Sequence, residues 1–273
     1  MSKATSIVLA ALLCATVAGA QAQDVSKFPD WKGQWSRLTP GTDPQWDPSK
    51  PAGRGQQPPL TAEYQKIWEA TLARQESGAP RIGTCIPPGM PRSMIAYDPF
   101  EIIVMPDTTY VMLSYMSEFR RIFTDVRKWP DDIEPSYAGY SIGKWIDENG
   151  DGKYDVLEVE TRGLKSGRTF DGSGIPMHED AETVVKERIY LDKSDQNVLH
   201  DEVTVSDHAL THPWTVNQRY TRDRKGEWTE FVCSEENHYV NIGKETYDVS
   251  ADGFLKPTRK DQPPPDLKYF KAK

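Results

Sequence analysis

The sequence predicts a mainly β protein, an antiparallel up-and-down barrel or strongly curved sheet with one N-terminal helix. Three observations indicate this fold class. From residue 100 onward, runs rich in Val, Ile, Thr and aromatic residues alternate with short turn segments. The connections between several runs, such as PDT and KSDQN, are short enough to make neighbouring strands antiparallel. One segment alone, ahead of these runs, has the spacing of an amphipathic helix.

Residues 1–22 are typical of a secretory signal peptide. An apolar run extends from Ile7 to Val17, and small residues at Ala18, Ala20 and Ala22 offer cleavage sites. No later run approaches the roughly 18 apolar residues that a membrane-spanning helix needs. We therefore expect export to the periplasm and no membrane span.

The segment that follows, residues 23–59, is rich in Pro, Gly and Gln. This composition predicts an extended N-terminal strap that crosses the main body and is held there by Trp31 and Trp35.

A helix is predicted at residues 61–77. Thr61 can cap its first turn, and Gly78 can end it. Its apolar face comprises Tyr64, Ile67, Trp68, Thr71 and Leu72.

Residues 60–250 are expected to form a single β domain that contains this helix. We predict strands near 100–105, 109–116, 118–124, 139–147, 153–160, 183–193, 197–206, 214–222 and 227–233. Closure into a lipocalin-like barrel would remove the exposed edges of such a sheet. Residues 251–273 are polar and rich in proline, so we expect a flexible C-terminal tail.

The net charge and its distribution along the chain indicate which class of partner the protein binds. The formal net charge is −8, and acidic and basic residues are spread along the chain rather than gathered into a basic face. This distribution argues against nucleic acid as a partner and favours a small-molecule ligand or substrate. The sequence leaves the oligomeric state open.

Two cysteines remain once the signal peptide, which contains Cys14, is removed. In an oxidising compartment, Cys85 and Cys233 have a single intramolecular pairing available, so we expect a disulfide. It would close a loop of about 150 residues. The alternative is a pair of buried free thiols.

The stretch DENGDGKYDVLE, residues 147–158, fits the calcium-loop pattern D-x-[DN]-x-[DN]-G-x5-E. The flanking residues have the pattern of strands rather than helices, which excludes an EF-hand and predicts a calcium loop at the tip of a β-hairpin. The expected ligands of this structural calcium ion are Asp147, Asn149, Asp151, the carbonyl of Lys153, Asp155 and, already on the outgoing strand, Glu158. The alternative is a solvated acidic turn, because Asn-Gly and Asp-Gly are common hairpin turns.

Two predicted strands carry one acid each on an otherwise apolar face. The first face comprises Val185, Glu187, Ile189 and Leu191, and the second comprises Leu199, Asp201, Val203 and Val205. If both faces point inward, Glu187 and Asp201 lie diagonally, roughly 7 to 8 Å apart. Paired carboxyl groups in an apolar interior have shifted pKa values and can serve as a general acid or base. The alternative is an internal ion pair that only orients the strands.

Other residues could complete such a site. Arg121, with Arg120 beside it, is the expected cation for an anionic group, and Tyr115, Trp214 and Tyr220 would supply aromatic walls. A further set comprises histidines near strand ends that could gather at one barrel mouth, namely His178, His208, His212 and His238. We expect His178 to contact substrate. The nucleophile elbow, the phosphate-binding loop and the dinucleotide fingerprint are missing from the sequence, which argues against ester hydrolysis by a nucleophile elbow, phosphoryl transfer and hydride transfer. We expect no organic cofactor.

Several motifs resemble those of a large group of exported, mostly uncharacterised proteins of proteobacteria and acidobacteria. They are TCIPPGMPRSM, PFEI, RRIFTD, GYSIGKW, ERIYLD, HPWTVNQRY and FVCSEENH. The resemblance implies a secreted, single-domain β protein with both cysteines inside recurrent motifs. It implies no function. Members commonly have histidine at the positions of Trp129 and Tyr140, and a short EGDT hairpin in place of the acidic loop, so a calcium site would belong to a subgroup.

Three functions remain open on the sequence alone. The first is a cofactor-independent lyase, isomerase or hydrolase that acts on an apolar or aromatic small molecule, with Glu187 or Asp201 moving the proton. The second is a periplasmic carrier that uses the same cavity, and the third is a calcium-stabilised structural module. An open interior with an unpaired acid would favour the enzyme, and a packed interior would favour the structural module.

Overall fold

The computed structural model describes residues 25–38, 45–76, 85–231, 233, 238–243, 245–250 and 252–265. The predicted signal peptide, Gly78 and the end of the tail lie outside these residues. Among the described residues, none of the helices combines the length and apolar character needed to cross a bilayer.

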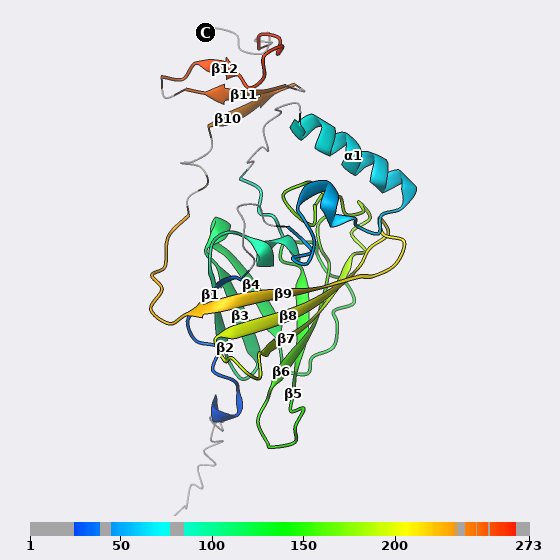
Figure 1. Ribbon diagram of the computed structural model, residues 1–273. Coiled ribbons are helices and arrows are strands. Elements are labelled where there is room, and N and C mark those ends of the chain that lie inside the picture. Colours follow the sequence, from blue (N-terminus) through cyan, green and yellow to red (C-terminus); the bar gives the residue numbers. More distant parts are fainter. Residues whose placement is uncertain are drawn as a thin grey trace, which may run out of the picture.

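Nine strands form a closed barrel, as the sequence predicts (Figure 1). They are β1 (Gln34–Arg37), β2 (Phe100–Val104), β3 (Thr108–Leu113), β4 (Glu118–Phe123), β5 (Tyr140–Ile146), β6 (Val156–Arg162), β7 (Val184–Leu191), β8 (Val198–Ser206) and β9 (Trp214–Asp223). Each strand pairs with the next along the chain, and β9 pairs with β1 to close the ring.

One pair departs from the predicted antiparallel order. Strands β4 and β5 are parallel, with Ile122 opposite Ser141 and Phe123 opposite Ile142. The long connection over residues 124–139 returns the chain to the end at which β4 began, which a tight hairpin turn cannot do.

The prediction of a strand at residues 227–233 is wrong, because residues 226–231 do not pair with any strand of the described chain. The barrel is instead completed by β1, which belongs to the predicted strap. Trp35 lies on this strand with no exposed surface, and its indole N–H donates to the carbonyl of Trp31 over 3.0 Å. A four-residue strand with one strong apolar position has too weak a pattern to be recognised beside prolines and glycines.

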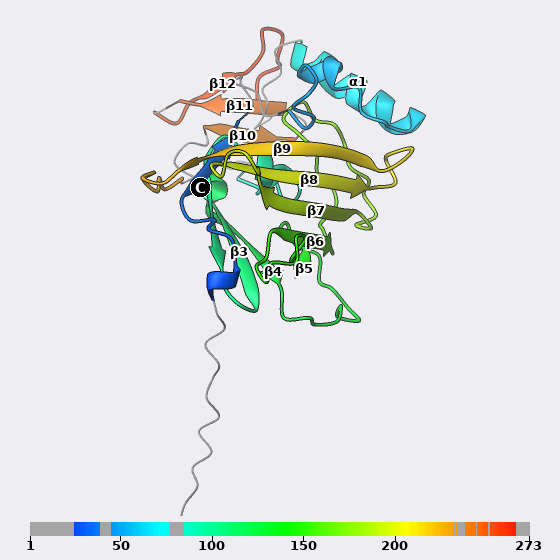
Figure 2. The same ribbon diagram turned by 60° about the horizontal axis from the view of Figure 1, so that its bottom comes forward.

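The helix α1 (Ala62–Glu76) forms where it is predicted. The Tyr64 N–H lies 3.5 Å from Thr61 Oγ1, which acts as the N-cap, and Trp68 and Leu72 are buried. The helix lies beyond one end of the barrel in both views (Figures 1 and 2). Trp68 Nε1 donates to Ser173 Oγ over 3.3 Å, which joins α1 to the β6–β7 connection.

A second, three-stranded antiparallel sheet follows the barrel. It contains β10 (Tyr239–Ile242), β11 (Glu245–Val249) and β12 (Leu255–Pro257). The expectation of a flexible tail is therefore wrong for residues 255–257, which pair with β11. Tyr247 anchors this part: its side chain is buried and its hydroxyl donates to the carbonyl of Pro263 over 2.9 Å.

The N-terminal strap closes both ends of the barrel. At the end with the β5–β6 hairpin, Phe28 and Trp31 pack on Trp145, with ring centroids 5.3 and 5.0 Å apart. At the opposite end, Trp46 packs on Phe170 and Trp214 and is fully buried. We call residues 45–60 the plug segment.

Candidate functional site: buried polar groups inside the barrel

The predicted inward faces of β7 and β8 are confirmed. Glu187 and Asp201 are both buried and lie among apolar neighbours on their strands. Asp201 is opposite Ile189 and Glu187 is opposite Val203, so the two acids are diagonal neighbours across the strand pair.

Glu187 is neutralised by a buried arginine. Arg120, on β4, is 1% exposed and its Nη1 lies 2.7 Å from Glu187 Oε1; a second bond joins Nη2 to Oε2. Arg120 Nη2 also donates to Thr161 Oγ1 over 2.9 Å, and Nε lies 3.4 Å from Ser141 Oγ. Both sides of the pair are therefore hydrogen-bonded, as a buried charge requires.

Arg121 does not fill the role that the sequence predicts for it. Its side chain is exposed on the outer face of the barrel, with the guanidinium carbon 5.8 Å from the centre of the Tyr110 ring. Arg120 shares the inward face with Ile122. The pattern is ambiguous in the sequence because Phe119, on the same face as Arg121, is a large apolar residue that is nevertheless 61% exposed.

Asp201 has no ion pair and no side-chain hydrogen bond within the part of the chain that the structure describes. Its side chain is fully buried, and neither carboxyl oxygen has a hydrogen-bond partner among the described residues. Burial raises the pKa of Asp201 well above its usual range, the nearby charge of Glu187 raises it further, and Arg120 opposes the shift. Burial therefore favours the neutral, protonated form of this carboxyl group, which is able to donate a hydrogen bond.

Tyr220 places a second neutral donor next to Asp201. It is opposite Leu199, while Asp201 is opposite Gln218, so Tyr220 and Asp201 are diagonal neighbours on the inward face. The Tyr220 hydroxyl is buried without a hydrogen-bond partner in the described chain, and burial raises the pKa of the phenol well above its usual range. Two such donors can bind one carbonyl or hydroxyl oxygen.

The remaining residues predicted to bind substrate are not gathered around this pair. Trp214 lies beneath the plug segment, against Trp46. Tyr115 packs on Phe231, with ring centroids 5.0 Å apart, and lines a separate pocket of about 370 Å³ with Arg92. His178 lies in the β6–β7 connection, beside Asp180.

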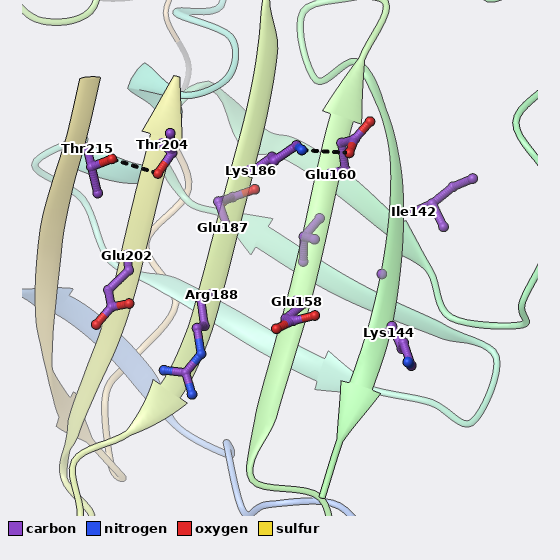
Figure 3. A pocket seen from close by; sticks show the side chains of 12 residues that line it. Ile142, Lys144, Glu158, Glu160, Lys186, Glu187, Arg188, Glu202, Thr204 and Thr215 are labelled. Atoms are coloured by element: carbon purple, nitrogen blue, oxygen red, sulfur yellow. Dashed lines mark hydrogen bonds and ion pairs between the residues drawn. The ribbon is translucent and has the colours of Figure 1, made fainter. Parts of the chain in front are cut away.

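Five pockets of the described residues are not lined by Asp201. A groove of about 510 Å³ runs over the outer face of β5 to β9 (Figure 3) and is lined by charges of both signs, such as Lys186 and Glu160, whose Nζ and Oε2 are 3.6 Å apart. Asp201 and Tyr220 line neither this groove nor the four other pockets, of 370 to 620 Å³, found in the described residues.

The acidic stretch forms the predicted tip of a β-hairpin, between β5 and β6. Asp147 accepts hydrogen bonds from the N–H groups of Gly150, Asp151 and Gly152, and Asp155 accepts one from Glu148. These bonds shape the turn with or without an ion, so calcium stays a prediction. The other expected ligands also belong to the hairpin: Asn149 and Asp151 accept further N–H groups, Lys153 donates one, and Glu158 lies exposed on β6 opposite Lys144.

The two cysteines are placed as expected. Cys85 and Cys233 form a disulfide with their Cα atoms 5.5 Å apart. It ties the segment before β2 to the segment after β9.

No known family model matches this chain, and no curated protein is significantly similar to it. The function is therefore inferred from the buried polar groups of the barrel.

Proposed function

We propose that this protein is an exported β-barrel that binds a small, largely apolar molecule in its interior and moves a proton on it without an organic cofactor. Asp201 is the acid, and the Tyr220 hydroxyl is the second donor to the same oxygen. The observation that carries the proposal is the Asp201 carboxyl group, which is fully buried with both oxygens unpaired. Such a group is costly in a core and is typical of functional sites.

The chemistry follows from the two carboxyl groups and their different surroundings. Arg120 forms a bidentate ion pair with Glu187, whereas burial raises the pKa of Asp201 and favours its protonated form. A neutral acid can protonate a carbonyl oxygen or a leaving group, and the resulting Asp201 carboxylate can take a proton back from the product. A group that donates and regains one proton fits an isomerase or a lyase better than a hydrolase, which must also position water.

Substrate entry would require the plug segment to move. Two polar contacts of Trp46 help to hold the plug over the end of the barrel, and at the other end of the plug the Pro59 carbonyl accepts the Thr211 N–H over 2.8 Å. Gln218 Nε2 donates to the Trp46 carbonyl over 2.5 Å, and the Trp46 N–H lies 3.3 Å from Asp171 Oδ2. Gln218 is opposite Asp201 on β8, so release of this contact would also expose the acid.

Export to the periplasm belongs to the same proposal. The Cys85–Cys233 disulfide supports it, because disulfides persist in oxidising compartments and are rare in the cytosol. Expression with the complete N-terminus, followed by fractionation and N-terminal sequencing, tests both cleavage and compartment.

The catalytic proposal is tested with an isosteric variant. We would incubate the protein with a panel of aromatic lactones, esters and β-hydroxy ketones and compare it with Asp201→Asn, Tyr220→Phe and the control Glu202→Gln. Glu202 is the next residue on β8, and its carboxylate accepts the Tyr190 hydroxyl over 2.7 Å. Asp201→Asn should keep ligand binding and lose at least about 100-fold in kcat. Equal turnover in all four proteins would remove Asp201 from the mechanism.

A calcium-stabilised structural module is the second candidate, and one observation favours it. Asp201 and Tyr220 line neither the surface groove nor the four other pockets given above, as expected for a filled barrel. Tryptophan fluorescence titrations with the same panel separate the two candidates. A ligand that binds the wild type and competes with an interior probe supports the enzyme, and the absence of any interior binding supports the module.

A further inference from the structure

Three metal-ligating side chains converge outside the barrel interior. His178 and Asp180 belong to the β6–β7 connection, and His208 belongs to the β8–β9 connection. One ligand atom from each residue lies within 4.8 Å of the other two. In the described part of the chain, no other group of three or more His, Cys, Asp or Glu residues meets this condition.

The ligand atoms face one another closely. Asp180 Oδ2 lies 2.9 Å from His178 Nδ1 and 2.5 Å from His208 Nδ1. The backbone N–H of Asp180 also points at His178 Nδ1, over 3.2 Å. If that nitrogen accepts the backbone N–H, its lone pair faces a carboxylate oxygen; if it is protonated, the N–H loses its acceptor. A cation bound between the imidazole nitrogen and the carboxylate removes the repulsion between the lone pair and the carboxylate oxygen, and it takes the place of the backbone N–H at that lone pair.

The surrounding hydrogen bonds fix the ligands in place. Asp180 Oδ1 accepts the Glu182 N–H over 3.0 Å, which leaves Oδ2 directed at the two imidazoles. Asp207 holds the two connections together, because its carboxylate accepts hydrogen bonds from the backbone N–H of His178 over 2.9 Å and from the Thr183 hydroxyl over 2.6 Å. Hydrogen bonds that fix the orientation of metal ligands in this way raise the affinity of a site for its metal.

The loop that carries Asp180 has a strained backbone. Ala181 has φ of +61°, a conformation that residues other than glycine rarely adopt. Both carboxylates that flank Ala181 lie near His208 Nδ1, with Glu182 Oε2 4.0 Å from that nitrogen. Strain of this kind persists where the surrounding structure holds it.

We propose that His178 Nδ1, Asp180 Oδ2 and His208 Nδ1 bind one divalent transition-metal ion, with zinc as the reference metal and Glu182 as the fourth ligand. Two imidazoles and one carboxylate are a donor set that zinc uses in proteins, with bonds of about 2.0 to 2.2 Å. Asp180 Oδ2 needs to move away from each histidine Nδ1 by less than about 1 Å to reach the spacing that such bonds imply. The ion would join the β6–β7 and β8–β9 connections at the end of the barrel that the plug segment covers.

The test uses the full chain, purified without a histidine tag and stripped of metal. Zn²⁺ binding is measured by calorimetry and Co²⁺ binding by visible absorption, which reports nitrogen and oxygen ligands directly. All variants are made in a protein that carries Asp147→Asn and Asp151→Asn, which we call the background protein. These two substitutions remove divalent-ion binding by the acidic hairpin. The ligand variants are His178→Asn, Asp180→Asn and His208→Asn.

Two matched controls come from the same chain. His200→Asn removes a second histidine–carboxylate pair, His200 Nε2 and Asp192 Oδ2, which are 3.1 Å apart. His212→Asn removes an exposed histidine four residues from His208 on the same connection.

We expect one ion per chain, a cobalt spectrum in the visible range, and a loss of at least about tenfold in affinity in each ligand variant. Both controls should bind as the background protein does. The proposal fails if the background protein binds no zinc, if His208→Asn binds zinc unchanged, or if His200→Asn or His212→Asn abolishes binding. Circular dichroism of each apo variant separates a lost ligand from a lost fold.

Discussion

Arg120 and Glu187 form a fully buried, bidentate ion pair between strands β4 and β7, with Nη1 2.7 Å from Oε1. The pair crosses the interior of the barrel rather than joining neighbouring strands. Removal of one partner leaves an unpaired buried charge, whereas replacement of both by apolar residues leaves none.

Glu187→Met and Arg120→Met should therefore each lower the free energy of unfolding by about 3 to 5 kcal/mol. The double variant Arg120→Met/Glu187→Met should recover much of this loss, because no charge is left in the core. Urea unfolding of the four proteins measures both effects. Additive losses in the double variant would contradict the assignment of the pair as a unit.

The buried carboxyl group of Asp201 should make the free energy of unfolding depend on pH. Its pKa is raised in the folded protein, while the unfolded value is roughly 3.9. The folded state therefore holds the proton more tightly, and the stability that the protonated group contributes is complete below the unfolded pKa and is lost as pH rises through the folded pKa. The unfolding free energy of the wild type minus that of Asp201→Asn should fall as pH increases above about 4. Parallel pH profiles for the two proteins would contradict a raised pKa.

We expect the Trp46 side chain to hold the plug segment against the end of the barrel. Its ring lies against Phe170 and Trp214, and its carbonyl accepts a hydrogen bond from Gln218. Trp46→Ala should cost about 3 to 5 kcal/mol of unfolding free energy and leave a cavity at this end of the barrel. A folded variant should then bind an apolar fluorescent dye that the wild type excludes. Trp228→Ala, an exposed tryptophan beyond β9, is the control.

The sequence predicts the fold well where a strand alternates cleanly. In β7 and β8, apolar residues and one acid repeat every second position, so the inward placement of Glu187 and Asp201 follows from the pattern alone. Strand β1 is missed because its pairing with β2 and β9 depends on segments far away in the chain, while its own residues give little signal.

The candidate site is only partly predictable for a similar reason. Adjacent arginines in β4 face opposite sides, and the choice between them depends on one residue of register. Tyr220 was expected as an aromatic wall, but its unpaired hydroxyl depends on which neighbours reach it. Asp180 meets His178 and His208 through the shape of two connections, which no periodic pattern in the sequence describes.

The disulfide predicts a large entropic contribution to stability. Cys85 and Cys233 are separated by 148 positions, so reduction frees a long loop in the unfolded chain. The chain-entropy model gives about 5 kcal/mol for such a loop. Urea unfolding should show this loss in Cys85→Ser/Cys233→Ser, and a reductant should lower the wild type to the same level without changing the variant. A wild type unaffected by complete reduction would contradict the prediction.

The acidic hairpin predicts a calcium response that is independent of the histidine cluster. Asp147, Asp151 and Asp155 place three carboxylates on one short turn, where like charges repel and a cation lowers that repulsion. Calcium at a hundredfold excess over its dissociation constant should stabilise the folded state by about 2.7 kcal/mol, seen as a higher Tm in calorimetry. Asp147→Asn/Asp151→Asn should lose this response, and His208→Asn should keep it. If calcium leaves the Tm of the wild type unchanged, the hairpin is an acidic turn stabilised by the backbone N–H groups that Asp147 and Asp155 already bind.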